Sequence, residues 1–250
     1  MGKKESDSGN LAEKIFLNFF NNKKYSELED CNLKSFLNFI CRSNTINEDE
    51  HIIYCWDYIK KSNLTKGNAK VDVELKINNR IFYISIKSGA NNSLHEEPKE
   101  TFLEFLKNFS VSSSDLNLIE RHMSEYIKIR NTSVDRFFKN NKKKIIKRVL
   151  EGRFKQETIP DYYFACKSIA DLSYKSAQKI LQKGVFASKK QTEEFMNSNN
   201  PDTKGKGSMT CDVGVLTYQA VGRKKHPKPQ FKWSKPYEDL KKIYEQQKSY

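Results

Sequence analysis

Apolar residues in the first part of the chain recur three and four positions apart, which is the spacing of one face of an α-helix. This pattern covers segments 11–20 and 33–40 and predicts two amphipathic helices. A third helix is expected to start near Glu48 and to carry Ile52, Ile53, Trp56 and Ile59. Polar residues and Gly67 mark its end. Residues 1–62 are therefore expected to form a helical N-terminal portion.

The next segment alternates apolar and polar residues, which is the pattern of two half-buried strands. Apolar side chains occupy every second position of 71–77 and 82–86. Asn78-Asn79 fits the turn between them, because Asn tolerates a positive φ. This turn sets Ile77 opposite Arg80 and places every apolar side chain on one side of a hairpin. The other side then carries Asp72, Glu74, Tyr83, Ser85 and Lys87.

Weaker signals predict further helices and strands in the rest of the chain. The expected strands are 162–166, 213–219 and 229–233, and the expected helices are 98–108, 112–130, 132–152, 176–182 and 236–247. Polar loops are expected over 89–93 and 197–207, and Gly184 suits the C-cap of the helix before it. These elements, without internal repeats, predict one α/β domain.

Composition and charge narrow the class of protein. The chain has 250 residues, of which 37% are hydrophobic and 30% charged, which excludes a disordered or collagen-like chain. No apolar run approaches the ~18 residues needed to cross a bilayer. Lys and Arg number 45 and Asp and Glu 31, so the net charge is +14. Such a surplus favours a polyanion as partner, and the alternative is a basic protein without specific anion binding.

Cysteine usage and motif searches exclude several chemistries. The five cysteines are odd in number and widely spaced, and no CxxC pair occurs. This pattern favours reduced thiols in a cytoplasmic protein over a disulfide framework or a zinc site. The sequence has no GxxxxGK[ST], GxGxxG or HExxH motif, so kinase, ATPase, Rossmann and zinc-protease activities have no support.

The polar side of the hairpin is the best candidate for a reaction centre. The register places Asp72 opposite Ser85, and Lys87 is the diagonal neighbour of Asp72, close enough for both to reach one atom. A carboxylate can hold Mg²⁺ with its waters, and a lysine can orient or deprotonate an attacking water. That combination suits phosphodiester cleavage. The alternative is an ordinary hairpin whose charged face meets water.

The stretch from Asp72 to Lys87 resembles the active-site hairpin of the PD-(D/E)xK nuclease superfamily, above all type II restriction endonucleases. Asp72 matches the first acid of that pattern and Lys87 matches the lysine. Ser85 stands where the second acid is usual, and no Pro precedes Asp72. Ser85 is then a hydroxyl that lines the site.

In restriction enzymes with Ser-x-Lys, the resemblance implies that the missing carboxylate comes from the helix that follows. Glu97 is the first choice because it directly precedes Pro98, and Glu100 is the next. Glu74 is a further candidate from the strand of Asp72.

The resemblance implies a central mixed β-sheet with a catalytic hairpin flanked by helices, in a single nuclease domain over 1–250. Residues 63–185 would form the catalytic core, and 186–250 would add strands and a helix for DNA or dimer contacts. The implied activity is Mg²⁺-dependent cleavage of double-stranded DNA at a specific short sequence. A homodimer without a membrane segment, in the cytoplasm of a prokaryotic cell, completes this expectation.

Two basic segments are candidates for DNA contact. In the expected helix 132–152, the candidates are Lys139, Lys142, Lys143, Lys144 and Arg148. Near the C-terminus they are Arg223, Lys224, Lys225 and Lys232, together with Gln219 and Gln230, since Gln can pair with an adenine edge. The alternatives are a solvated helix face and aromatic strands that serve the core or a dimer contact.

Two other functions fit the same residues. One is a nuclease of the same fold that repairs or processes DNA or RNA. The other is a basic binding module without chemistry, in which Asp72 and Lys87 form an ordinary cross-strand ion pair. Discrete DNA fragments, structure-dependent nicks, or binding without cleavage would distinguish the three.

Overall fold

The computed structural model describes residues 2–47, 52–58, 61, 70–90, 92–109, 111–151, 159–199, 207–222 and 226–248. The chain forms two compact units. The first comprises Met1–Ala90, Thr158–Thr192 and Lys235–Tyr250, and the second comprises Asn91–Glu157 and Glu193–Ser234. Each unit thus combines segments that are far apart in the sequence, whereas the three expected portions are consecutive.

The first unit is built on a six-stranded sheet in the order β1-β2-β3-β4-β6-β7. Its strands are β1 (Lys23–Lys24), β2 (Ile52–Asp57), β3 (Val73–Ile77), β4 (Arg80–Ser88), β6 (Tyr162–Cys166) and β7 (Val185–Ser188). Only the β4–β6 pair is parallel. The α/β class with a mixed sheet is therefore confirmed.

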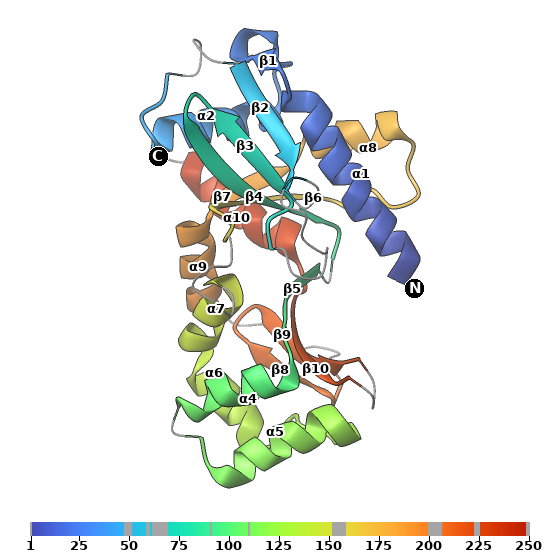
Figure 1. Cartoon of the computed structure of the whole chain (residues 1–250), viewed down its shortest axis with the longest axis vertical. Coiled ribbons are helices and arrows are strands. Elements are labelled where there is room, and N and C mark those ends of the chain that lie inside the picture. Colours follow the sequence, from blue (N-terminus) through green and yellow to red (C-terminus); the bar gives the residue numbers. More distant parts are fainter. Residues whose placement is uncertain are drawn as a thin grey trace. The chain divides into compact units, whose positions relative to one another are not determined.

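Helices bury the apolar face of this sheet. They are α1 (Gly2–Phe20), α2 (Asn32–Ser43), α8 (Tyr174–Leu181) and α10 (Pro236–Lys248). Figure 1 shows α1 alongside β2, and the two are in contact. Phe36 of α2 lies 6.0 Å from Phe16 and 5.5 Å from Phe164 between ring centroids. Aromatic rings from helix and sheet thus form the core of the first unit.

The prediction of a third helix is wrong, because residues 52–57 form strand β2. Ile53 and Cys55 are buried and pair with Ile77 and Leu75 of β3. The period of burial is two, and β-branched and aromatic residues favour such a pleated surface. The apolar positions fit both periods, and pairing with β3 decides between them. Glu48 and Ile59 lie outside the described residues.

The predicted hairpin is confirmed as β3 and β4. Ile77 pairs with Arg80, Leu75 with Phe82 and Val73 with Ile84, which is the predicted register. Asn78 has a φ of 55°, as the turn requires. The apolar side is buried against the core, so the polar side faces away from it.

The second unit is built on a four-stranded antiparallel sheet in the order β5-β10-β9-β8. Its strands are β5 (Asn92–Glu96), β10 (Lys228–Trp233), β9 (Leu216–Val221) and β8 (Thr210–Val213). The expected strand 229–233 is confirmed. The expected strand 213–219 is interrupted by a turn at Gly214, which has a φ of 59°. Strand β5 replaces part of the expected loop 89–93, because pairing with β10 satisfies a polar segment that has no strand pattern of its own.

Four helices of the second unit cover one face of this sheet (Figure 1). They are α4 (Lys99–Lys107), α5 (Ser113–Glu125), α6 (Ser133–Asn140) and α7 (Lys142–Glu151). The expected helix 132–152 is broken at Asn141, where the chain leaves helical geometry. Helix α5 has the predicted Ser112 cap but ends at Tyr126, in the left-handed conformation, instead of near Arg130.

The segment after α8 differs from its expectation. The helix ends at Gln182, and Gly184 does not have a positive φ. A Cβ atom at Gly184 would lie 2.3 Å from the ring of Phe164, so the glycine is required by packing and not by a cap. Strand β7 and helix α9 (Lys189–Ser198) follow and shorten the expected loop 197–207.

Candidate active site

Asp72, Ser85 and Lys87 meet on the polar side of the hairpin. The backbone N–H of Asp72 donates to Ile84 O at 2.9 Å, which fixes the strand end. Oδ2 of Asp72 accepts hydrogen bonds from Ser85 Oγ at 3.0 Å and from the backbone N–H of Ile86 at 2.6 Å. Lys87 Nζ lies 3.9 Å from the same oxygen. The hairpin register thus brings together the aspartate, hydroxyl and ammonium that the sequence analysis selected.

The carboxylate of Asp72 has one oxygen fixed and one available. Its side chain is 19% exposed and that of Lys87 is 12% exposed, so the pair is only partly screened by water. No described residue donates a hydrogen bond to Oδ1. An oriented carboxylate with an available oxygen fits Mg²⁺, which takes one or two protein carboxylates, water and substrate phosphate.

Glu74 lies on the same side of β3 as Asp72 but is held by other residues. Its side chain is buried and forms an ion pair with Lys61. Lys61 in turn lies 4.5 Å from the ring centroid of Trp56. Burial and the charge of Glu74 raise the pKa of Tyr83, its cross-strand partner. Glu74 therefore belongs to an ion-pair and aromatic cluster next to the Asp72 site.

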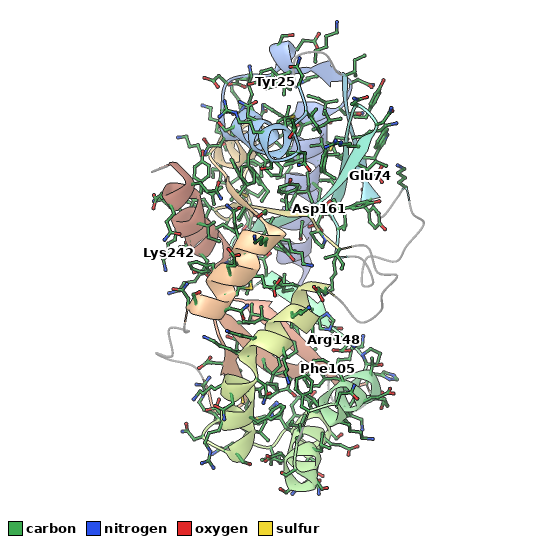
Figure 2. All side chains as sticks on the ribbon, turned by 90° about the vertical axis from the view of Figure 1, so that its left-hand side faces the viewer. Tyr25, Glu74, Phe105, Arg148, Asp161 and Lys242 are labelled. Carbon is green, nitrogen blue, oxygen red and sulfur yellow. The ribbon has the colours of Figure 1, made fainter. Side chains whose placement is uncertain are left out.

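Glu97 lies in the second unit, directly after β5. One of its oxygens is 2.9 Å from His95 Nε2, and the other accepts from Arg148 Nη2 at 2.9 Å. Burial raises the pKa of Glu97, but His95 and Arg148 outweigh burial and leave the pKa lowered. Arg148 also lies 4.9 Å from the ring centroid of Phe105, and Figure 2 labels both residues. Glu100, the other candidate on this segment, is exposed on α4.

The sequence did not identify the partners of Glu97. The sequence analysis predicts that Arg148 contacts DNA. In the structure Arg148 is only 16% exposed, and it pairs with a carboxylate that lies 51 positions away in the sequence. An amphipathic helix pattern does not show which of its cations turns inward, so this pair had no signal in the sequence.

Helices α6 and α7 carry several lysines on the side that faces solvent. Lys143, Lys144 and Lys147 are exposed, and Lys142 is half-buried. Lys139 pairs with Asp135 at 2.9 Å but keeps half of its side chain exposed. The apolar side of both helices is buried, as predicted from the sequence. This surface can meet a phosphate backbone without disturbing the core.

The C-terminal candidates divide between described and undescribed residues. Arg223, Lys224 and Lys225 lie outside the described residues. Gln219, Gln230 and Lys232 lie on β9 and β10, where burial alternates along β10. The two glutamines face each other, with Gln219 Nε2 donating to Gln230 Oε1 at 2.8 Å.

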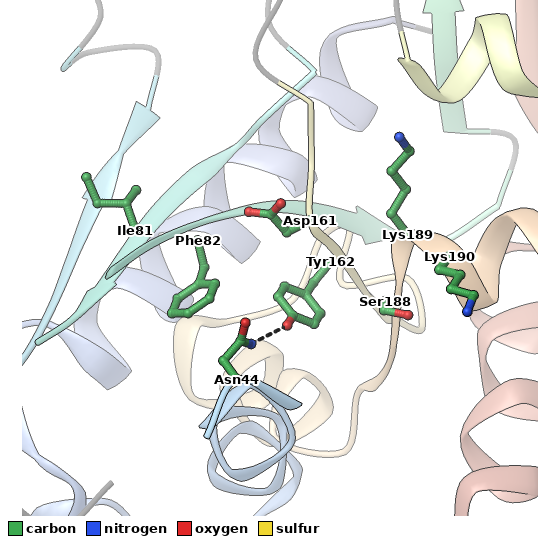
Figure 3. A pocket seen from close by; sticks show the side chains of 8 residues that line it. All are labelled: Asn44, Ile81, Phe82, Asp161, Tyr162, Ser188, Lys189 and Lys190. Carbon is green, nitrogen blue, oxygen red and sulfur yellow. Dashed lines mark hydrogen bonds between the residues drawn. The ribbon is translucent and has the colours of Figure 1, made fainter. Parts of the chain in front are cut away.

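A pocket of about 380 Å³ opens elsewhere on the first unit. Figure 3 shows Asp161, Tyr162 and Lys189 among its lining residues. Tyr162 accepts a hydrogen bond from Asn44 at 2.9 Å, and Asp161 accepts one from the backbone N–H of Tyr83. Burial raises the pKa of Asp161. Asp72 and Lys87 are not among the lining residues.

Comparisons with known proteins give no family for this chain. No protein-family model matches the sequence, and no curated protein matches it. Within the described part of the chain, no three His, Cys, Asp or Glu side chains gather as a metal site. None of the described helices is long and apolar enough to span a bilayer. The proposed activity therefore depends on the geometry of the hairpin.

Proposed function

We propose that this protein is a Mg²⁺-dependent endonuclease that cleaves double-stranded DNA at a specific short sequence. The observation that carries the proposal is the 3.9 Å approach of Lys87 Nζ to Asp72 Oδ2 on a hairpin. The net charge of +14 adds a reason to expect a polyanionic substrate. The resemblance of the hairpin to type II restriction endonucleases supports the reaction class.

Each residue of the hairpin site has a separate role. Asp72 would hold the metal through its carboxylate, which Ser85 and the Ile86 amide orient through Oδ2. Lys87 orients the attacking water and stabilises charge on the phosphate. Mg²⁺, when bound, would polarise the phosphate and lower the pKa of a bound water.

A second carboxylate is proposed to complete the metal shell. Glu97 is the first candidate because of its position after the hairpin, although His95 and Arg148 bind both of its oxygens. Glu100 and Glu74 are the alternatives. Glu100 is exposed, and Glu74 is paired with Lys61.

The substrate surface and the assembly complete the proposal. The lysines of α6 and α7 would neutralise DNA phosphates, with release of counterions. Restriction enzymes of this kind commonly act as symmetric dimers on palindromic sites, so we propose a homodimer. We place the protein in the cytoplasm of a prokaryotic cell, where such enzymes act.

A cleavage assay with the full chain tests the function. Phage DNA is incubated with protein and Mg²⁺, and in parallel with protein and EDTA. Discrete fragments that need Mg²⁺ are expected. Smears or nicks at structured sites would favour a repair or processing nuclease, and tight binding without cleavage would favour a binding module. Either result would overturn the assignment as a restriction enzyme.

A further inference from the structure

One cross-strand row of polar side chains runs over the whole sheet of the second unit. Glu96 of β5 pairs with Gln230 of β10, which pairs with Gln219 of β9, which pairs with Thr210 of β8. Paired residues point to the same side of a sheet. The residues next to them in the sequence, such as Phe231, are buried under the helices. The row therefore lies on the face opposite the core of the second unit.

Hydrogen bonds along this row have a fixed direction. Lys228 Nζ donates to Glu96 Oε1 at 3.2 Å, which supports the ionised carboxylate. Gln230 Nε2 donates to Glu96 Oε2 at 3.1 Å, and Gln219 Nε2 donates to Gln230 Oε1 at 2.8 Å. An ionised carboxylate can only accept hydrogen bonds, so Gln230 must turn its amide nitrogen toward Glu96. Its oxygen then faces Gln219 and requires that residue to donate.

These hydrogen bonds leave the Gln219 amide group with a fixed acceptor and a fixed donor for a ligand. Its Oε1 accepts no hydrogen bond from a described residue, and its Nε2 retains a second N–H. An acceptor beside a donor on one amide matches the N6–H and N7 of adenine in the major groove. Without Glu96, both amides could rotate and exchange donor for acceptor. Glu96 thus determines which hydrogen-bond donor and acceptor groups this row of side chains presents.

We propose that this face reads base edges of duplex DNA, with Gln219 contacting adenine and Glu96 positioning the two amides. Duplex DNA is the occupant that we infer, since the chain carries +14 and Lys232 lies on this side of β10, while Lys228 is paired with Glu96. The proposal rests on the proposed function, because it states how the nuclease selects its sequence.

The test measures binding apart from cleavage. Wild-type protein selects sequences from a randomised duplex pool with Ca²⁺ in place of Mg²⁺. Fluorescence anisotropy then gives Kd for the selected and for a scrambled duplex, and the ratio measures selectivity. Glu96→Gln should lower this ratio about 10- to 100-fold. Its Kd for the scrambled duplex should stay equal or become tighter, because a negative charge is removed. A residue with only a structural role would weaken both.

Gln219→Leu provides the second variant. This substitution should lower the selectivity ratio by a similar factor, because it removes the amide that is proposed to contact adenine. Replacing adenine by 7-deazaadenine, position by position, should weaken wild-type binding about fivefold to tenfold at one position. Gln219→Leu should no longer respond at that position. Gln182→Leu is the matched control, since Gln182 also donates to a glutamate, Glu29, but belongs to the first unit. It should behave as wild type.

The outcomes separate this inference from the proposed nuclease. If the ratio of the two Kd values is unchanged in both Glu96→Gln and Gln219→Leu, the proposal that this sheet face reads bases is overturned, even if the protein cuts DNA at one sequence. Equal loss of affinity for both duplexes in both variants overturns it as well, and so does a wild type without selective binding. If binding is selective and depends on Gln219 but the protein does not cut DNA, the proposal of base reading by this face is supported and the proposal of nuclease activity is overturned.

Discussion

Ser85 donates a hydrogen bond of 3.0 Å from Oγ to Oδ2 of Asp72. The serine is buried, so its hydroxyl is directed at the carboxylate and not at water. Together with the Ile86 amide it fixes the orientation of Asp72. In the proposed nuclease, this hydroxyl would orient Asp72 toward the metal, and another segment would supply the second carboxylate.

Ser85→Ala should lower the rate of DNA cleavage about tenfold. The substitution removes one hydrogen bond to a charged group, worth about 1.5 kcal/mol, while the Ile86 amide still holds Asp72. Single-turnover cleavage at saturating protein measures the effect. Ser114→Ala, which removes an exposed hydroxyl on α5, is the control. A Ser85→Ala rate equal to wild type would mean that the hydroxyl does not orient Asp72.

Asp72→Asn and Lys87→Ala should each lower cleavage by a factor of about 100 or more. In the proposed mechanism the first substitution removes the charge that would hold the metal, and the second removes the cation that would lie beside the phosphate. DNA binding should survive in both variants, because the basic surface is unchanged.

The controls for that pair of variants are Glu125→Gln and Lys241→Ala, which break exposed ion pairs on α5 and α10. Both should cut at the wild-type rate. Normal cleavage by Asp72→Asn would remove the aspartate from the reaction and with it the proposed mechanism.

The hairpin was predictable because every constraint on it is local. A two-residue turn fixes the register, and alternation fixes the side to which each residue points. The Asp72–Lys87 pair follows from those two facts. Strand β2 was missed because Ile53 and Cys55 fit a helix as well as a strand, and only pairing with β3 decides.

Features that depend on contacts between distant segments could not be predicted from the sequence. The polar strand β5 exists because β10, which lies more than a hundred positions later, supplies its partners. The division into two units that combine distant segments has the same origin. Glu97 was selected for its position after the hairpin, yet its two partners, His95 and Arg148, could not be inferred from spacing.

Gly184→Ala should destabilise the first unit by about 1–3 kcal/mol, as overpacked cores generally do. The new methyl group would lie 2.3 Å from the ring of Phe164, which is itself fully buried. Urea unfolding followed by fluorescence measures the change. Gly207→Ala is the matched control, since a Cβ there meets no atom within 4 Å. Equal stability of both variants would show that Phe164 has room to move.

Thiol reactivity should separate Cys31 from the other four cysteines, which are buried. Burial raises the pKa of Cys166 to about 11, despite a hydrogen bond from Ser88 that lowers it. At pH 8 only about one such thiol in a thousand is ionised. The native protein should therefore react with Ellman's reagent first at the half-buried Cys31, and with all five thiols in denaturant. Cys31→Ser should remove the first phase, and its persistence would contradict the burial of the other four.

Glu97→Gln should destabilise the protein by about 3 kcal/mol at pH 7, because it leaves the largely buried Arg148 without its carboxylate. The difference from wild type should depend on pH. The pKa of Glu97 in the folded protein lies below its ordinary value of 4.5, so the carboxylate stabilises the fold fully at pH values above 4.5. That stabilisation is lost as the pH falls through the folded-state pKa. Urea unfolding from pH 7 to pH 3 should therefore show the two proteins converging only below pH 4.5.

The exposed pair of Arg121 and Glu125 provides the comparison for this experiment. Glu125→Gln should match wild type within about 0.5 kcal/mol across the range, since surface pairs contribute little. A Glu97→Gln difference that stayed constant from pH 7 to pH 3 would show that the carboxylate does not act through its charge. Because unfolding is measured without DNA or metal, the result bears on the ion pair whether or not Glu97 also binds Mg²⁺. Convergence of the two stabilities below pH 4.5 would mean that the ionised Glu97 carboxylate stabilises the folded second unit through Arg148 and His95.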